Sequence, residues 1–305
     1  MIEGTFLGTA SAFPTALRNH PSIYLSIDGT HLLLDCGEGT QRQIRKAGVS
    51  PSVDYIFITH WHGDHSLGIG GIIQSLNMMS RKDPVFVFGP AGTNARLDHL
   101  MKTYQFHSAI KVVPKPLNAP TEKLVITIGD YEVYAVNVKH AVQCIGYRIR
   151  GRDTLNLRED MLKKYGIKPN PLLKRLKEGK DVTINGKKLS YKKFTYVKRG
   201  KSLAYLTDLS YSDKVYRFAR DVDVLIIEAT FSSSMTEKAG SYLHLTVEQS
   251  LKIAKKANAK KVYLVHTSQR YDNEDTLRKD AEAAKAKLGL DAEVIFPNDL
   301  DKLEI

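Results

Sequence analysis

The sequence has little cysteine. Cys36 and Cys144 are the only two in 305 residues, and neither belongs to a Cys-x-x-Cys pair. This usage argues against a zinc site made of cysteines and against a scaffold held by disulfides. We therefore expect two buried, reduced thiols, as in a cytoplasmic protein.

Long apolar runs are also missing. No stretch approaches the ~18 uninterrupted apolar residues that would indicate a membrane-spanning helix. Residues 1–9 lack a basic segment followed by an apolar one, so we expect no signal peptide. The hydrophobic fraction of 42% and the charged fraction of 26% are typical of a soluble globular protein with a sizeable core and no membrane partner.

Excess charge is nearly absent outside one segment. Residues 151–200 carry 15 Lys and Arg against 5 Asp and Glu, whereas the other 255 residues carry 30 against 28. Almost all of the net charge of +12 therefore lies in one sixth of the chain. Such a block indicates a surface for a polyanion, the alternative being a solvated, lysine-rich loop.

The rest of the chain alternates strand-like and helix-like patterns on both sides of the basic segment. Turn signals such as Asp28-Gly29 and Gly129-Asp130 separate the strands. The predicted strands are Ile2–Gly8, Ser22–Ile27, His31–Asp35, Tyr55–Thr59, Val85–Phe88, Leu124–Ile128, Tyr131–Val138, Ser202–Thr207, Val222–Glu228, Lys261–Val265 and Glu293–Ile295. The predicted helices are Thr40–Ala47, Ile69–Met79, Arg96–Tyr104, Thr246–Ala257 and Asp272–Lys287.

The basic segment has a different composition, with prolines and glycines and no long apolar run. Two short helices, Arg158–Tyr165 and Pro171–Glu178, and a hairpin over Asp181–Thr195 are predicted within it. Its apolar residues look too few for a core of its own. We therefore expect an arm inserted into a single domain.

The most informative motif is His60-Trp61-His62-Gly63-Asp64-His65, which directly follows a predicted strand. Imidazoles two positions apart can face one concavity, and Gly63 permits a tight bend that turns Asp64 and His65 toward it. Imidazole and carboxylate ligands suit zinc, with manganese or iron as competitors. The motif predicts a metal site at a strand end, where α/β folds gather their chemistry.

Further ligands are available at other strand ends. His140, Asp208 and His266 each come directly or almost directly after a predicted strand, so we expect them to complete the metal site. The remaining histidines outside the motif lack this setting and are expected to be structural or surface residues: His20, His31, His99 and His107.

This ligand series resembles that of the metallo-β-lactamase superfamily, and within it the chain resembles the ribonuclease Z family, endonucleases that trim the 3′ end of precursor tRNA. The resemblance covers nearly the whole chain. It also rests on Pro14-Thr15-Ala16-Leu17-Arg18-Asn19, Leu33-Leu34-Asp35-Cys36-Gly37-Glu38-Gly39-Thr40-Gln41, Glu228-Ala229-Thr230-Phe231, His244-Leu245-Thr246 and His266-Thr267-Ser268-Gln269-Arg270-Tyr271.

The resemblance implies an α/β metallo-β-lactamase fold, a four-layer αββα sandwich of two mixed sheets flanked by helices. It implies a single domain over residues 1–305, with residues 151–200 as an inserted flexible arm that binds tRNA. Members of the family are commonly homodimers, so a homodimer is expected as well.

The resemblance also implies roles for individual residues. His60, His62 and His140 would hold one zinc ion, and Asp64, His65 and His266 a second, with Asp208 bridging them. Asp64 would take a proton from the attacking water, and Glu228 with His244 would protonate the departing 3′ oxygen. The products would be tRNA with a 3′-hydroxyl, cut near the discriminator nucleotide, and a trailer with a 5′-phosphate. Expected RNA contacts are Arg18, Asn19, Lys174, Arg175, Lys177 and Arg270.

Three positions depart from the family pattern. The bridging aspartate stands in Thr207-Asp208-Leu209 where Gly-Asp-Thr is usual. The arm has Asn170-Pro171 in place of Gly-Pro, and asparagine is the next best residue for a left-handed turn. Leu245 replaces a serine beside His244, and we expect a weaker substrate contact there.

Two other functions fit parts of the sequence. A two-metal hydrolase of the same fold can act on small phosphodiesters or other esters. Such an enzyme has no evident use for a balance of +10 within fifty residues. An RNA-binding module with a structural metal is the other alternative, but structural zinc sites usually contain cysteine and have four ligands. The sequence therefore favours an RNA endonuclease.

Overall fold

The structure is a computed structural model that describes residues 2–103, 110–271 and 275–305. The expectations for Tyr104, His107 and Asp272 lie outside these residues. The chain divides into two compact units. The first, here called the body, comprises Met1–Ile149 and Ser202–Ile305, and the second, the insert, comprises Arg150–Lys201.

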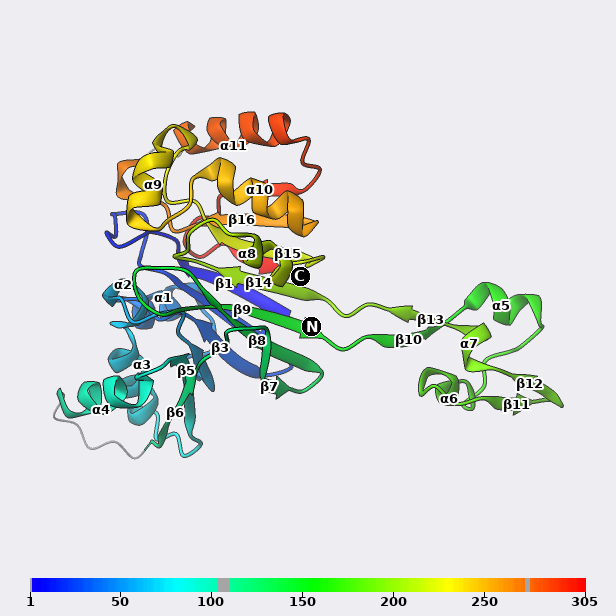
Figure 1. Ribbon diagram of the computed structural model, residues 1–305. Helices are drawn as coiled ribbons and strands as arrows, with labels where there is room; N and C mark the ends of the chain where they lie inside the picture. Colours follow the sequence, from blue (N-terminus) through cyan, green and yellow to red (C-terminus); the bar gives the residue numbers. More distant parts are fainter. Residues whose placement is uncertain (1, 104–109, 272–274) are drawn as a thin grey trace. The chain divides into compact units, whose positions relative to one another are not determined.

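Two seven-stranded sheets form the body (Figure 1). The first has the order β18-β1-β2-β3-β4-β5-β6, and the second β17-β16-β15-β14-β9-β8-β7. The strands of the first sheet are Lys302–Glu304, Ile2–Gly8, Ser22–Ile27, Thr30–Leu34, Tyr55–Phe57, Val85–Pro90 and Val112–Leu117. Those of the second are Glu293–Ile295, Lys261–Val265, Val224–Glu228, Ser202–Leu206, Cys144–Gly151, Tyr131–Val138 and Lys123–Ile128.

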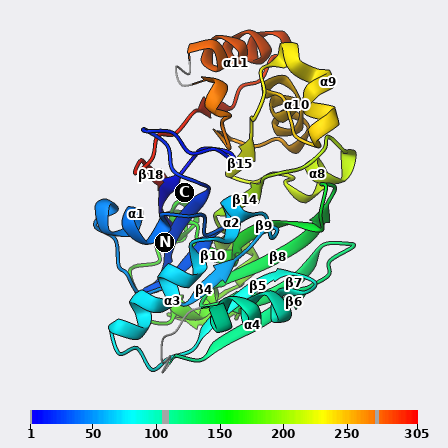
Figure 2. The same cartoon turned by 90° about the vertical axis from the view of Figure 1, so that its left-hand side faces the viewer.

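Helices cover the outer face of each sheet (Figures 1 and 2). Those that follow strands of the first sheet are α1 (Thr40–Ala47), α2 (Gly63–Ser66), α3 (Ile69–Met78) and α4 (Thr93–Thr103). The second sheet is followed by α8 (Asp213–Phe218), η1 (Ser233–Met235), α9 (Thr236–Tyr242), α10 (Val247–Ala257), η2 (Gln269–Tyr271) and α11 (Asp275–Leu288).

Three hydrophobic clusters hold these layers together. One lies between the sheets and combines residues of both, such as Phe57 and Tyr205. A second packs α1, α3 and α4 on the first sheet, and a third packs α8, α10 and α11 on the second. Because each sheet buries one face against the other sheet and one against helices, the body is the αββα sandwich of the metallo-β-lactamase fold.

Parallel pairing places the functional strand ends together. Strands β3, β4, β5 and β6 pair in parallel in the first sheet, as do β14, β15, β16 and β17 in the second. The carboxyl ends of parallel strands share one edge of a sheet. The loops after β4, β14 and β16 therefore gather side chains from distant parts of the sequence.

Local signals explain why the helices begin and end where they do. Thr246 caps α10 in a reciprocal capping box with Gln249, which satisfies two backbone N–H groups of the first turn. Helix α1 ends at Gly48, whose φ of 64° is a left-handed conformation that glycine adopts without strain. The predicted start of α10 at Thr246 thus corresponds to its cap.

The sequence prediction missed several body strands, namely β6, β9 and β18. Strand β6, VVPKPL, contains two prolines at the edge of its sheet, which is the position where a strand tolerates them. Strand β9 carries two arginines and Gly146 in an otherwise apolar run, which weakens the strand pattern. No helix among the described residues is long and apolar enough to cross a membrane.

The insert has a small core of its own, which corrects the expectation that its apolar residues are too few. Seven buried side chains form this core: Leu162, Leu173, Leu176, Val182, Ile184, Leu189 and Phe194. The elements around it are β10 (Thr154–Leu157), α5 (Glu159–Lys164), α6 (Leu173–Lys177), β11 (Val182–Ile184), β12 (Lys187–Leu189), α7 (Tyr191–Phe194) and β13 (Thr195–Lys198). Lysines and other polar residues interrupt these apolar residues, so the segment shows no long apolar run.

Two details of the insert also differ from expectation. The hairpin turning at Asn185-Gly186 ends at Leu189, because the chain then forms α7 instead of continuing as a strand. Asn170 does not adopt a left-handed backbone. Its side-chain oxygen accepts a 2.8 Å hydrogen bond from the Leu172 backbone N–H, so an Asx turn replaces the expected conformation.

Candidate metal centre and active site

Loops and a short helix after four body strands carry the histidines and carboxylates of the site. His60 and His62 lie in the loop after β4, and Asp64 and His65 lie on α2, which follows that loop directly. The others follow strands of the second sheet: His140 after β8, Asp208 after β14 and His266 after β16. Residues more than two hundred positions apart therefore meet at one place.

These side chains form two groups that share Asp208. Within each group, one ligand atom of every residue lies within 4.8 Å of the others. The first group contains His60, His62, His140 and Asp208, and the second contains Asp64, His65, Asp208 and His266.

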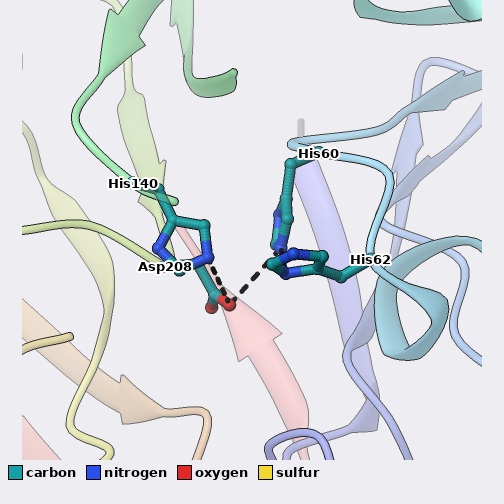
Figure 3. A group of neighbouring side chains, drawn as sticks. All are labelled: His60, His62, His140 and Asp208. Carbon is teal, nitrogen blue, oxygen red and sulfur yellow. Dashed lines mark hydrogen bonds and ion pairs between the residues drawn. The ribbon is translucent and has the colours of Figure 1, made fainter. Parts of the chain in front are cut away.

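The Asp208 carboxylate faces both groups. Its Oδ2 lies 3.5 Å from Nε2 of His60 and 3.9 Å from Nε2 of His140 (Figure 3). The same oxygen is 3.5 Å from Nε2 of His65, and Oδ1 is 3.1 Å from Nε2 of His266. A carboxylate in this position can serve as a common ligand of two sites.

The chemistry of the inward-facing atoms fits metal ions. Nε2 of His65, His140 and His266 is buried without a hydrogen-bond partner among the described residues. A buried polar atom without a partner costs free energy, which a metal ion at the same point would recover. A set of imidazole and carboxylate ligands that contains no cysteine suits zinc, manganese or iron.

Outer contacts fix the orientation of four of the imidazoles. The Nδ1 atom of each faces an oxygen of the surrounding protein, which leaves Nε2 directed inward. These pairs are His60 with Thr59 Oγ1 at 3.0 Å, His65 with Asp35 Oδ2 at 2.8 Å, His140 with the Leu243 carbonyl at 3.3 Å, and His266 with Thr230 Oγ1 at 2.9 Å. The imidazoles are therefore preorganised for a ligand at Nε2.

Asp35 is the most connected of these outer residues. It follows β3 and is completely buried, with φ of 56° in the left-handed region. Its carboxylate accepts hydrogen bonds from the backbone N–H of Thr59 at 2.7 Å and from the hydroxyl of Tyr205 at 2.8 Å. Sequence reasoning gave Asp35 no role, although it stands at the end of a predicted strand, close to where the other site residues stand.

The electrostatics of His60, His140 and Asp208 favour the protonation states of metal ligands. Burial lowers the pKa of His60 well below its ordinary value and also lowers that of His140, so both imidazoles are neutral. Burial raises the pKa of Asp208, but the neighbouring His266 and His65 outweigh it and hold that pKa well below the usual range. Neutral imidazoles and an ionised carboxylate are the forms that bind metal. At His65, burial lowers the pKa, but the carboxylates of Asp208 and Asp35 outweigh burial and raise that pKa well above its ordinary value.

A second pair of residues, Glu228 and His244, lies beside the metal groups. Glu228 is the last residue of β15 and is fully buried. Its Oε2 faces Nδ1 of His244 at 2.9 Å and accepts from the hydroxyl of Thr230 at 2.7 Å. Burial lowers the pKa of His244, but the Glu228 carboxylate outweighs burial and raises that pKa to about 9.

Leu245 does not face the pocket. Its side chain is fully buried in the cluster on the outer face of the second sheet, while its backbone N–H donates to Glu228 at 3.1 Å. The expectation of a weakened substrate contact at this position is therefore wrong, because the leucine supports the Glu228 carboxylate through the backbone and the core through its side chain.

An open pocket of about 480 Å³ gives access to these residues. It is lined by His62, Asp64, His140, Asp208, His244 and His266 from the site and by Lys238 and Arg270. Phe13 and Tyr242 also line it, and both are largely exposed. The sequence reasoning did not single out these two aromatic residues.

The expected RNA contacts lie in different settings. Arg18 donates hydrogen bonds to the Pro297 carbonyl at 2.8 Å and to Asn298 at 3.2 Å, and Asn19 donates to the Glu38 carbonyl at 2.7 Å. Arg18 and Asn19 are thus engaged within the protein and do not line the pocket, whereas Arg270 does. Lys174, Arg175 and Lys177 are exposed on α6 of the insert.

Comparisons with known proteins agree with this architecture. Two family descriptions match parts of the chain, "Anti-Pycsar protein Apyc1" over residues 2–143 and "Beta-lactamase superfamily domain" over residues 185–267. The chain is 36% identical to ribonuclease Z of Pyrococcus horikoshii, covering 100% of this chain and 96% of that protein. It is 34% identical to ribonuclease Z of Bacillus subtilis, covering 100% and 98%.

Solved structures show the same fold. The short form of human tRNase Z superposes with a TM-score of 0.71 at 23% identity, and 99% of each chain is covered. A diphosphatase of the PhnP family gives a TM-score of 0.65 at 21% identity, covering 100% of this chain and 98% of the other. At these identities the likeness concerns the fold alone.

Proposed function

Because the chain belongs to the ribonuclease Z family, we propose that it is a metal-dependent endoribonuclease that removes the 3′ trailer from precursor tRNA. The cut lies near the discriminator nucleotide and leaves a 3′-hydroxyl on the tRNA and a 5′-phosphate on the trailer. The observation that carries the proposal is the Asp208 carboxylate, which faces two groups of ligand atoms and so suits hydrolysis at a phosphate.

The proposed metals are two zinc ions per subunit, with manganese or iron as alternatives. His60, His62 and His140 would hold one ion, and Asp64, His65 and His266 the other, with Asp208 shared. Bound there, the ions supply Lewis acidity toward the scissile phosphate and activate water at neutral pH. The unpartnered Nε2 atoms of three of these histidines support this assignment.

Two of the chain's own groups handle protons in the proposal. Asp64 lies at the pocket and accepts a proton from the attacking water. His244 has its Nδ1 held by Glu228, so its Nε2 holds the proton that the departing 3′ oxygen takes up. The raised pKa of His244 keeps this imidazole protonated at neutral pH, as a general acid requires.

RNA binding is proposed for the insert and for the pocket rim. Lys174, Arg175 and Lys177 present cationic side chains on α6, and Arg270 lies at the pocket. Contacts to the phosphate backbone explain why 15 basic residues are concentrated in fifty positions. A hydrolase of small phosphodiesters does not account for this concentration.

Deleting residues 152–199 tests the substrate assignment. The structure assigns these residues to a unit with its own core, so the body is expected to keep its fold without them. The shortened protein should hydrolyse bis(p-nitrophenyl) phosphate at an unchanged rate and lose cleavage of precursor tRNA. Retained tRNA cleavage, or loss of both activities in a folded protein, would overturn the assignment.

The setting of the protein is proposed to be the cytoplasm, since Cys36 and Cys144 are buried free thiols and need no oxidising compartment.

A homodimer remains a proposal that rests on the family. Light scattering of the purified protein would give its mass in solution, and a monomer at working concentration would contradict it.

A further inference from the structure

Two aromatic side chains at the rim of the pocket have most of their surface exposed. Phe13 is 65% exposed and Tyr242 is 60% exposed, yet both line the pocket that holds the metal ligands. Phe13 comes from the loop after β1, and Tyr242 ends α9. Large aromatic rings beside a reaction site are typical of surfaces that stack on a ligand.

The cations at the same rim indicate what kind of ligand this is. Lys238 and Arg270 line the pocket together with the two rings. The Arg270 guanidinium lies 6.0 Å from the centroid of Phe231, whose ring is in turn 6.4 Å from that of Tyr242. Alternating cations and aromatic faces fit a single-stranded nucleic acid, with phosphates on the cations and bases on the rings.

Tyr242 lies near the proposed general acid, His244. Tyr242 is two residues from His244, and the Phe231 ring lies 6.3 Å from the His244 imidazole. Since His244 protonates the departing 3′ oxygen in the proposed reaction, the nucleotide that carries this oxygen lies on the Tyr242 side. That nucleotide is the last one of the tRNA.

The loop that carries Phe13 lies beside the segment of His266. Ser11 donates a 3.0 Å backbone hydrogen bond to Thr267, the residue after His266, and Ala10 pairs with Thr267 in a parallel bridge. His266 in turn lies 3.6 Å from Asp64, the proposed acceptor of the proton from water. The imidazoles of His266 and His244 stack with their centroids 5.3 Å apart, so the loop of Phe13 lies beside the same scissile phosphate as Tyr242. With Tyr242 assigned to the departing nucleotide, Phe13 is assigned to the other nucleotide joined to that phosphate, the first of the trailer.

We propose that Tyr242 stacks on the discriminator nucleobase of precursor tRNA and that Phe13 stacks on the first nucleobase of the trailer. This inference rests on the proposed function and adds a binding subsite on each side of the scissile phosphate. Stacking uses the face of a base and not its edge, so the two subsites accept any base. They hold the two nucleotides apart and fix the phosphate over the metal ligands.

The test combines variants of the protein with variants of the substrate. Three precursor tRNAs are compared: one intact, one with an abasic nucleotide at the discriminator position and one with an abasic nucleotide at the first trailer position. The full-length, metal-loaded protein is measured unaltered and as Tyr242→Leu and Phe13→Leu. Tyr242→Phe, which keeps the ring, and Leu17→Ala, an exposed apolar residue of the same loop as Phe13 that does not line the pocket, are matched controls.

Stacking of one base contributes about 5- to 100-fold in affinity, so we expect each leucine variant to lose about tenfold in kcat/KM on the intact substrate. Tyr242→Leu should lose nothing further on the substrate that is abasic at the discriminator, and Phe13→Leu nothing further on the one abasic in the trailer. Each should keep its full loss on the other abasic substrate. Both controls should match the unaltered protein.

Equal losses on all three substrates, or no loss on the intact one, would overturn the subsites. The unaltered protein gives a second check that needs no variant, since each abasic substrate should itself be cut about tenfold less efficiently. Failure of the proposed function gives a different result, because the unaltered, metal-loaded protein would then leave the intact precursor uncut.

Discussion

Tyr205 in the second sheet donates a 2.8 Å hydrogen bond to Asp35 at the end of a strand of the first sheet. The Asp35 oxygen that receives this bond also lies 2.8 Å from Nδ1 of His65. The two sheets are thus joined through a carboxylate that orients a proposed metal ligand. Packing between the sheets and the geometry of the metal site therefore depend on each other.

Replacing Tyr205 by phenylalanine should reveal this dependence. The buried Asp35 carboxylate would lose a donor, so we expect Tyr205→Phe to lower the free energy of unfolding by about 1–3 kcal/mol. Urea denaturation of the metal-free protein measures this loss. Zinc affinity should fall as well, because His65 is less firmly oriented.

Tyr147→Phe is a suitable control for this change. Tyr147 is also buried between the sheets, but its hydroxyl donates to the Ile58 carbonyl at 2.8 Å and contacts no proposed ligand. It should reduce stability without a matching loss of zinc affinity. Equal zinc affinities for the two variants would argue against a link through Asp35.

Thr230 should prove to be a positioning residue. Its hydroxyl joins Oε2 of Glu228 at 2.7 Å to Nδ1 of His266 at 2.9 Å, and so connects the proposed general-acid pair with a proposed metal ligand. We expect Thr230→Val to weaken zinc binding about 10- to 100-fold, the range for loss of an outer partner of a metal ligand. Competition with a chelator measures the affinity.

Thr230→Ser keeps the hydroxyl and should restore zinc binding nearly to that of the unaltered protein. Valine has the shape of threonine, so a loss confined to the valine variant isolates the hydrogen bonds from packing. If serine were as damaging as valine, the role of Thr230 would be one of packing alone.

The His244 imidazole should titrate well above an ordinary histidine in the metal-free protein. Burial opposes its charge, but Glu228 raises its pKa to about 9. The raised pKa stabilises the fold fully below the unfolded value of ~6.5, and this contribution is lost as the pH rises through about 9. NMR titration of the imidazole nitrogens gives the value directly.

Glu228→Gln is the matched variant for this titration. It keeps the shape of the side chain but removes the charge that faces Nδ1 of His244. The pKa of His244 should then fall, and the alkaline loss of stability should move to lower pH. An unchanged titration would show that Glu228 does not set the charge of His244.

Metal content should separate the two groups of ligands. The unaltered protein should bind two zinc ions per chain, since the two groups share only Asp208. His140 belongs to the first of these two groups and His266 to the second. His140→Ala and His266→Ala should therefore each retain about one ion. Atomic absorption after dialysis measures this, and two ions in either variant would contradict the assignment.

Removal of zinc should also lower stability. Ions that bind the folded chain stabilise it in proportion to the logarithm of their excess over Kd, so the melting temperature should rise with added zinc. Chelator treatment should abolish catalysis and lower the melting temperature. An Asp208→Ala variant should show almost no zinc-dependent shift, because it loses the ligand common to both groups.

The sequence predicts the side chains that the structure brings together as candidate metal ligands, because each of them follows a strand with a clear apolar pattern. Four of them stand together in the sequence, namely His60, His62, Asp64 and His65. Each of the other three likewise comes directly or almost directly after a strand. The two halves of the sandwich are predictable for the same reason. The parallel order of the strands, which brings these ends together, comes from tertiary packing.

Outer partners of the ligands are not predictable in this manner. Thr230 and Tyr205 are common residues of apolar runs, and nothing nearby in the sequence links them to His266 or Asp35. The insert shows a similar limit, since its seven core residues are dispersed among polar residues and form a core only in the folded chain. The roles of Thr230, Tyr205 and the core residues of the insert follow from contacts with residues that are distant in the sequence.

The most direct test of the account is cleavage of a precursor tRNA that carries a 3′ trailer, followed by identification of the cut and of both new ends. We expect one cut beside the discriminator nucleotide, a 3′-hydroxyl on the tRNA, a 5′-phosphate on the trailer, and no cleavage by Asp64→Ala. Hydrolysis of bis(p-nitrophenyl) phosphate by a zinc-loaded protein that leaves the precursor intact would contradict the account.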